Sequence, residues 1–363
     1  MHGTLGVASQ LLRPKDRGFR YPCTPGDSMT RKLSYCLYGV DPTKPLPDPV
    51  AVDRPRSFGI GGLFQWAEAV NQAGGHGIIF PHMSRDALEQ FDIVHVNYTP
   101  RNSNYVLALR DVLGEHSDTK IIANVDFAVT LWNNIDPMIL KSVLDKCDMV
   151  FHVEPIGAGI LSDYLGRKVY TLPHPVDVGG IREHVAVRPT EEPVTISCQY
   201  HRYNDNWYPY FYALNALRSQ YGIRTSLVNV SERSHAAPSI ESLFDHIHHR
   251  YDYEVYLDLL SRMFINVDVT QDVVYGRGVV DAAALGIPTV GCANTYSMNI
   301  IFPELIVERS FDCSGIRDRV ERLLTSPEFA SDMSKLGVER CSYFSLGRSY
   351  NRLVLALERA ELI

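Results

Sequence analysis

The segment from Tyr275 to Val290 carries the residues best suited to chemistry in this chain of 363 residues. Gly276 and Gly278 flank Arg277 and allow a tight turn directly before an alanine-rich helical stretch. The free N–H groups and positive dipole end of a helix can hold a diphosphate, to which Arg277 would add a fork of charged donors. Asp281 follows one turn later, where a carboxylate can accept from a ribose hydroxyl. The segment therefore predicts a nucleotide site.

A plainer interpretation is a glycine turn before a packing helix, with Asp281 as a favourable charge in its first turn. The surrounding sequence favours the nucleotide site, because the segment resembles the nucleotide-sugar motif of a large retaining GT-B family. This family comprises the glycogen-synthase-like and sucrose-synthase-like glycosyltransferases (glycosyltransferase group 1, family 4-like). Tyr275-Gly276 matches the aromatic-glycine turn of the motif, and Asp281 matches its second acidic residue. The run from Ala284 to Pro288 matches its Gly-x-Pro ending.

One position departs from the family motif. Val273 stands where the family has its first acidic residue, and Asp272 lies one position away. In the family that acid contacts the transferred sugar. The resemblance therefore leaves the identity of the sugar and the detailed catalytic arrangement open.

Three further segments are similar to the family in the expected order. Residues 91–97 look like its third N-terminal strand, residues 171–177 like its interdomain hinge, and Gly61-Gly62 like the glycine loop that faces the donor phosphates. The resemblance covers residues 32–360. It implies an α/β fold of two Rossmann-like domains facing across a cleft, a UDP- or GDP-sugar as co-substrate, retention of anomeric configuration, and no metal.

Two polar residues outside the C-terminal motif are candidates for the same site. Arg202 follows the first strand of the second half, where the family places an Arg and a Lys against the diphosphate. No lysine follows here, so an ordinary surface arginine is equally compatible.

Asp126 ends a predicted strand, in the region from which the family directs a His-Asp or His-Gly pair at the sugar. A helix N-cap or turn aspartate is the alternative. The predicted catalytic residues are Asp126, Arg277 and Arg202, and the predicted donor-binding residues are Gly61, Gly62, Arg202, Tyr275, Gly276, Arg277, Gly278 and Asp281.

The elements that must position these residues follow from the alternation of short apolar runs with helical patterns. This alternation predicts parallel sheets with helices on both faces. Two prolines and two glycines within residues 172–180 interrupt the series and predict a domain boundary. We expect a disordered tail at 1–28, an acceptor domain at 29–178, and a nucleotide-sugar domain at 179–345. A C-terminal helix at 346–363 could cross back to the first domain.

Composition narrows the class of protein. Hydrophobic residues make up 45% and charged residues 21%, which is enough to build two cores. The formal charge of -7 argues against a surface that binds nucleic acid all over. Seven cysteines without a C-x-x-C pair, no secretory signal and no apolar run of ~20 residues predict a cytoplasmic protein without a transmembrane segment.

Histidines invite other interpretations that the sequence does not favour. His246, His248 and His249 form an incomplete metal site, and we expect a polar helix or loop at residues 239–253. His95 and Asn97 alternate on one face of a strand, where a satisfied structural histidine is the commoner explanation. No metal is therefore predicted.

The predicted function is a hexosyl- or pentosyltransferase that uses a nucleotide sugar. One alternative is a nucleotide-sugar epimerase of the same fold, which would act without an acceptor. The other is a non-catalytic nucleotide- or sugar-binding protein, motivated by the missing acid at Val273. A metabolite, a glycan, a protein or a modified DNA base would each serve as acceptor. Six basic residues within 13–32 mildly favour a polyanion or membrane surface, although a solvated tail is the simpler interpretation.

Overall fold

A computed structural model provides the structure of this chain. It describes residues 32–38, 64–79, 84–98, 103–126, 132, 135–184, 194–200, 207–230, 242–249 and 253–363. The predicted tail and the predicted site residues Gly61, Gly62 and Arg202 lie outside the described residues. Arg31–Ile363 form one compact unit.

The first half of this unit is built on a parallel sheet of six strands in the order β2-β1-β3-β4-β5-β6. Crossover helices connect the strands, as parallel pairing requires. The strands are β1 Ser34–Tyr38, β2 His76–Ile79, β3 Ile93–Tyr98, β4 Lys120–Val125, β5 Met149–His152 and β6 Tyr170–Thr171. The helices are α1 Gln65–Gln72, α2 Arg85–Leu88, α3 Ser103–Leu113, α4 Pro137–Leu144 and α5 Pro155–Leu165.

The second half repeats this plan on a sheet in the order β12-β11-β10-β7-β8-β9. Its strands are β7 Thr195–Gln199, β8 Arg224–Val230, β9 His246–His249, β10 Ile265–Asp268, β11 Thr289–Cys292 and β12 Ile306–Val307. Its helices are α6 Val178–His184, α7 Tyr208–Tyr221, α9 Tyr253–Ser261, α10 Arg277–Ala284, α11 Tyr296–Ile301, α12 Cys313–Thr325 and α13 Pro327–Arg340, and helix α14 Leu346–Arg359 ends the chain. Two sheets of this kind confirm the predicted α/β class. The domain boundary near residue 178 stays a prediction.

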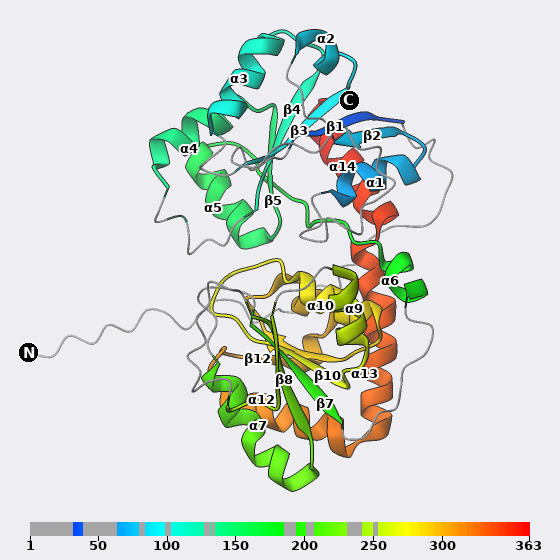
Figure 1. The fold of residues 1–363 in the computed structure, drawn as a ribbon. Coiled ribbons are helices and arrows are strands. Elements are labelled where there is room, and N and C mark those ends of the chain that lie inside the picture. The colour runs from blue at the N-terminus through cyan, green and yellow to red at the C-terminus, as the bar shows by residue number, and fades with distance from the viewer. Residues whose placement is uncertain are drawn as a thin grey trace, which may run out of the picture. The chain divides into compact units, whose positions relative to one another are not determined.

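Helices cover both faces of the first sheet, which explains why its central strands are mostly apolar. One core lies between the sheet and helices α3, α4 and α5, which contribute Leu109, Val143 and Leu161. A second core lies on the other face, where Trp66 and Val70 of α1 pack against β1. Figure 1 shows α3, α4 and α5 together on one side of this sheet. Strands that are buried on both faces have continuous hydrophobic sequences, rather than sequences that alternate between hydrophobic and polar residues.

Helix α14 completes the second of these cores although it comes last in the sequence. Tyr350, Leu353 and Leu357 are buried among Leu33 and Trp66. Helices α1 and α14 are in direct contact, and Figure 1 shows the red end of the chain beside α1. The C-terminal segment is thus part of the structure that supports the first sheet.

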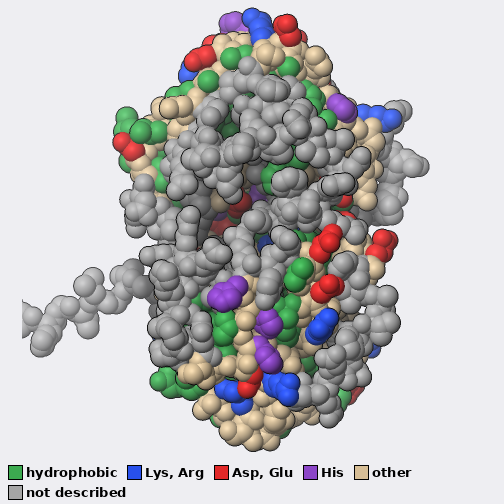
Figure 2. Space-filling view, viewed as in Figure 1, with side chains coloured by type: hydrophobic (Ala, Val, Ile, Leu, Met, Phe, Trp, Pro, Cys, Tyr) green, Lys and Arg blue, Asp and Glu red, His purple; other side chains and the backbone are tan. Residues whose placement is uncertain are grey.

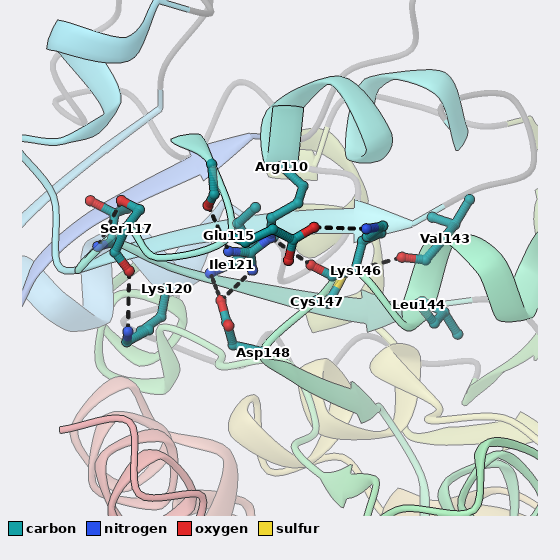
Figure 3. A network of polar contacts seen from close by, with 12 residues as sticks. Arg110, Glu115, Ser117, Lys120, Ile121, Val143, Leu144, Lys146, Cys147 and Asp148 are labelled. Carbon is teal, nitrogen blue, oxygen red and sulfur yellow. Dashed lines mark hydrogen bonds and ion pairs between the residues drawn. The ribbon is translucent and has the colours of Figure 1, made fainter. Parts of the chain in front are cut away.

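A buried arginine organises the amino-terminal edge of the first sheet (Figure 3). Arg110 on α3 pairs with Asp148 at 2.6 Å and donates through Nε to the carbonyl of Lys146. Asp148 also accepts from the backbone N–H of Ile121 at the start of β4. Pairing and hydrogen bonding together compensate for burying these charges. This network lies at the opposite ends of the strands from Asp126, and its role is structural.

The prediction of a polar helix or loop around residues 239–253 was wrong for residues 246–249. His246–His249 form β9, an edge strand that pairs in parallel with β8, with a register shift after Val228. Backbone pairing to an existing strand edge overrides the weak local propensity of a histidine-rich run. Burial, followed by the charge of His246, lowers the pKa of His248. Histidine side chains gather on the face seen in Figure 2.

The described part of the chain lacks two features, a metal-binding cluster and a membrane-spanning helix. It contains no group of three or more His, Cys, Asp or Glu side chains placed to hold a metal ion. None of its helices has the length and apolar character needed to cross a membrane.

Candidate active site

The site begins at the turn that starts α10. Gly276 caps this helix in the left-handed conformation, with φ +81°. A Cβ atom at this position would lie 2.2 Å from Thr295 Cγ2 and 2.5 Å from Ser297 Oγ. The Ser297 hydroxyl donates to the Gly276 carbonyl at 2.7 Å. Only glycine fits this turn, which places Arg277 at the first position of the helix.

Arg277 is held by groups from three separate elements. Its Nε donates to Asp281 Oδ1 at 2.7 Å, and its Nη2 donates to the Tyr253 hydroxyl at 2.6 Å. Its Nη1 donates to Gln65 Oε1 at 3.0 Å, from the start of α1. The Arg277 side chain is 20% exposed, whereas that of Asp281 is 2% exposed. The guanidinium is therefore oriented before any ligand binds.

The electrostatics of this cluster keep the arginine charged. Burial lowers the pKa of Arg277, but the Asp281 carboxylate and the Tyr253 hydroxyl raise it, and the net pKa lies above its ordinary value. Burial is also the main reason that the pKa of Tyr253 lies well above its ordinary value. The guanidinium thus stays charged, in an ion pair with Asp281 and in contact with a neutral phenol.

Asp281 occupies the position expected from the sequence, one turn into α10. In this structure it accepts from Arg277 and from Tyr253, and both bonds end on Oδ1. The side chain therefore positions Arg277. A hydrogen bond from a ribose hydroxyl to the Asp281 carboxylate stays a prediction. Such a bond would use the remaining lone pairs of the carboxylate.

Polar groups also meet where β7 and β10 end. A Cβ atom at Gly278 would lie 3.4 Å from Asp268 Oδ2, 3.5 Å from the Tyr256 hydroxyl and 3.8 Å from Gln199 Cδ. Gln199 and Asp268 are the last residues of their strands. Ligands of open α/β sheets bind at such carboxyl ends, beside the start of a helix. The residues that precede α10 include Val273, which is half-buried, and Asp272, which is 4% exposed.

The predicted residues Tyr275 and Asp126 are connected through His174. The Tyr275 hydroxyl donates to the His174 carbonyl at 3.0 Å. His174 Nε2 lies 2.9 Å from Asp126 Oδ2, which is an ion-pair distance without the alignment of a hydrogen bond. Asp126 directly follows β4, and its side chain is 34% exposed. The structure thus brings the candidate carboxylate and the segment before α10 to the same histidine.

A buried polar chain runs across the first sheet toward its carboxyl edge. The Tyr35 hydroxyl contacts His95 Nδ1, and His95 Nε2 contacts Asn124 Oδ1 at 2.7 Å. Asn124 donates to Asn97 Oδ1 at 2.8 Å. Burial lowers the pKa of His95 to about 3, despite the bond to Asn124 that raises it. His95 is therefore a neutral, satisfied structural histidine, as the sequence indicated.

Sequence reasoning missed four site residues: Tyr253, Gln65, Trp66 and His174. His174 lies within the predicted hinge, flanked by two prolines, which was the one available signal. Tyr253 and Gln65 have no motif, because their role depends on contacts with a residue far along the chain. Gln65 and Arg277 are separated by 212 positions.

The crowding at Gly276 predicts a specific loss of stability. Gly276→Ala should lower the free energy of unfolding by about 2–4 kcal/mol, because strain in the left-handed conformation adds to overpacking against Thr295. Gly222 is the matched control, since its φ is +66° and nothing lies within 4 Å of a Cβ there. Gly222→Ala should cost about 1 kcal/mol. Urea denaturation followed by circular dichroism measures both, and equal losses would contradict the crowding.

Comparison with solved structures identifies the fold. An alpha,alpha-trehalose 6-phosphate synthase from Burkholderia multivorans matches with a TM-score of 0.63 at 12% identity, over 91% of this chain and 99% of that chain. An alpha-glucosyltransferase in complex with UDP and a 13-mer DNA containing an HMU base matches with 0.64 at 11% identity, over 91% and 99%. A trehalose-6-phosphate synthase studied for glycosyltransfer with retention matches with 0.59 at 12% identity, over 76% of each chain.

These similarities confirm the predicted GT-B fold of two Rossmann-like domains. The agreement extends over nearly the full length of two of the three neighbours. No protein-family model and no curated protein sequence matches the chain.

Proposed function

We propose that this chain is a glycosyltransferase that moves a sugar from a UDP-sugar to a hydroxyl-bearing acceptor, with retention and without a metal. The observation that carries the proposal is the guanidinium of Arg277 at the start of α10, held by Asp281 and Tyr253 and joined to Gln65. This places a preoriented cation beside a helix N-terminus, at the edge of a sheet where nucleotides bind.

The chemistry of the reaction explains why this arrangement is useful. The bond between the anomeric carbon and the diphosphate oxygen breaks, a bond to the acceptor oxygen forms, and the proton of the acceptor hydroxyl passes to the departing diphosphate. Negative charge builds on the leaving diphosphate, and positive charge builds on the sugar. Arg277 and the positive end of α10 stabilise the first charge, and the Asp126 carboxylate stabilises the second. Because these groups are already oriented, little reorganisation is needed during the reaction.

The similar structures support the choice of donor. One neighbour was solved with UDP together with DNA that contains an HMU base, and another was studied for glycosyltransfer with retention. We therefore favour UDP over GDP, which the sequence left open. The acceptor would bind on the side of the first sheet, near Asp126.

Two measurements, made one after the other, test the proposal. Isothermal titration with UDP, GDP and UDP-glucose should give binding that is strongest for the uridine compounds. UDP release from UDP-glucose is then measured with glucose 6-phosphate, with an HMU-containing oligonucleotide, with glycans and without an acceptor. Acceptor-dependent release supports transfer, whereas a changed sugar without acceptor supports an epimerase. Binding without release under every condition would support a binding protein instead.

Asp281 provides a prediction that concerns nucleotide binding. Asp281→Ala should weaken UDP binding by about 1–3 kcal/mol and leave the protein folded, because Arg277 loses its anchor and a ribose acceptor is removed. Glu254→Ala, which removes an exposed carboxylate from α9, is the control and should leave the affinity unchanged. Unchanged UDP affinity in folded Asp281→Ala protein would remove this carboxylate from the site.

A further inference from the structure

We propose that His174 is a positioning residue locked as the neutral Nε2–H tautomer, so that it directs an N–H at Asp126 without neutralising that carboxylate. The proposal rests on the transferase function for the role of Asp126, and it assigns to His174 and Trp66 a task within that site. Three sets of contacts around the imidazole carry it.

The tautomer follows from the partner of Nδ1. The indole Nε1 of Trp66 donates to His174 Nδ1 at 3.3 Å. An indole N–H is a donor only, so Nδ1 must be the acceptor and the proton of the neutral ring resides on Nε2. Trp66 is fully buried and held edge-on against Phe151, which leaves the indole no freedom to turn away. A second proton on His174 would place an N–H against another N–H.

The other ring nitrogen lies beside the candidate carboxylate. Nε2 is buried, lies 2.9 Å from Asp126 Oδ2, and has no hydrogen-bond partner within the described ranges. Buried N–H groups are strongly driven to pair, so a small rotation of the carboxylate toward this N–H is favourable. The side chain of His174 is 3% exposed, so water does not compete for Nε2.

The described titratable groups that face the imidazole are one carboxylate and two groups that stay neutral. The titratable groups that face it are Asp126 after β4, His95 on β3 and Tyr275 before α10. His95 is neutral, since burial lowers its pKa to about 3. Burial also raises the pKa of Tyr275, so its hydroxyl stays a phenol and donates to the His174 carbonyl. Asp126 is the charged member of this group.

The consequence for the reaction is electrostatic. An imidazolium at His174 would form an ion pair with Asp126 and cancel the negative charge that stabilises the sugar. A neutral N–H orients the carboxylate but leaves its charge intact. Trp66 thus acts through His174: its indole N–H occupies Nδ1 and leaves the ring proton on Nε2, beside Asp126.

Two substitutions at position 174 separate this role from simple packing. His174→Gln keeps an N–H that reaches toward Asp126, whereas His174→Asn keeps an oxygen beside Trp66 but is too short for Asp126. We expect the Gln variant to release UDP from UDP-glucose within about threefold of the parent rate, and the Asn variant to lose about tenfold or more in kcat with little change in KM. Equal rates in the two variants would overturn the positioning role.

The tautomer itself is tested without any turnover. Nitrogen NMR of protein labelled at histidine, with the His174 signals assigned by their loss in His174→Gln, should show an unprotonated Nδ1 and a protonated Nε2 at pH 8. In Trp66→Phe, which removes the donor to Nδ1, these signals should shift toward a mixture of the two tautomers, and UDP release should slow. A neutral His174 that carries its proton on Nδ1 in the parent would refute the proposal. If the parent releases no UDP at all, the transferase function fails, while the NMR result still decides the tautomer.

Discussion

Replacement of Arg277 by alanine should reduce the turnover of sugar transfer on the order of 10²-fold or more, with a smaller loss of donor affinity. The diphosphate carries more negative charge as it leaves than while it is bound, so the arginine stabilises the transition state more than the ground state. Lysine should rescue only in part, because it keeps the charge but loses the planar fork, whose three nitrogens bond separately to Asp281, Tyr253 and Gln65. Steady-state kinetics at saturating UDP-sugar measure the effect.

Arg309→Ala is the control for this experiment, because Arg309 is an exposed arginine. This variant should transfer sugar at the parent rate. If folded Arg277→Ala protein also matched the parent at saturating donor, the proposed phosphate role would be wrong. A low rate combined with a changed circular dichroism spectrum would indicate a folding defect, which Arg277→Lys should then lack.

Asp126→Asn should lower kcat on the order of 10²-fold while donor affinity stays within about threefold. Asparagine has the same shape as aspartate, but it lacks the charge that stabilises the developing oxocarbenium ion. Single-turnover measurements with bound UDP-sugar isolate this step. Asp111→Asn neutralises an exposed carboxylate on α3 and should have no effect. A rate near that of the parent in folded Asp126→Asn would exclude Asp126 from the reaction.

The fold could be predicted from the sequence because its determinants are local. Alternating strand and helix patterns are enough to predict parallel sheets. Each crossover helix carries the chain back to the end of the sheet where the strands begin. The turn at Gly276 was recognisable for the same reason: the glycines, Arg277 and Asp281 lie within one short segment. The structure places these residues at the start of α10, as that segment indicated.

The remainder of the site depends on contacts that no local pattern encodes. Tyr253 reaches Arg277 from the preceding helix, and Gln65 reaches it from α1, which packs on the first sheet. Asp126 lies beside His174 of the predicted hinge, whose importance comes from the indole that donates to it rather than from any motif. The strand β9 was missed because backbone pairing, rather than an apolar pattern, determines its conformation.

The packing of α14 against α1 has a consequence for the order of folding during synthesis. Leu33 and Trp66 leave the ribosome long before Leu353 and Leu357, which bury them in the finished protein. One face of the first sheet therefore stays incomplete until the last helix emerges, so this half cannot reach its native state ahead of the other. Nascent chains would expose that apolar face throughout elongation, which makes it a natural binding surface for chaperones.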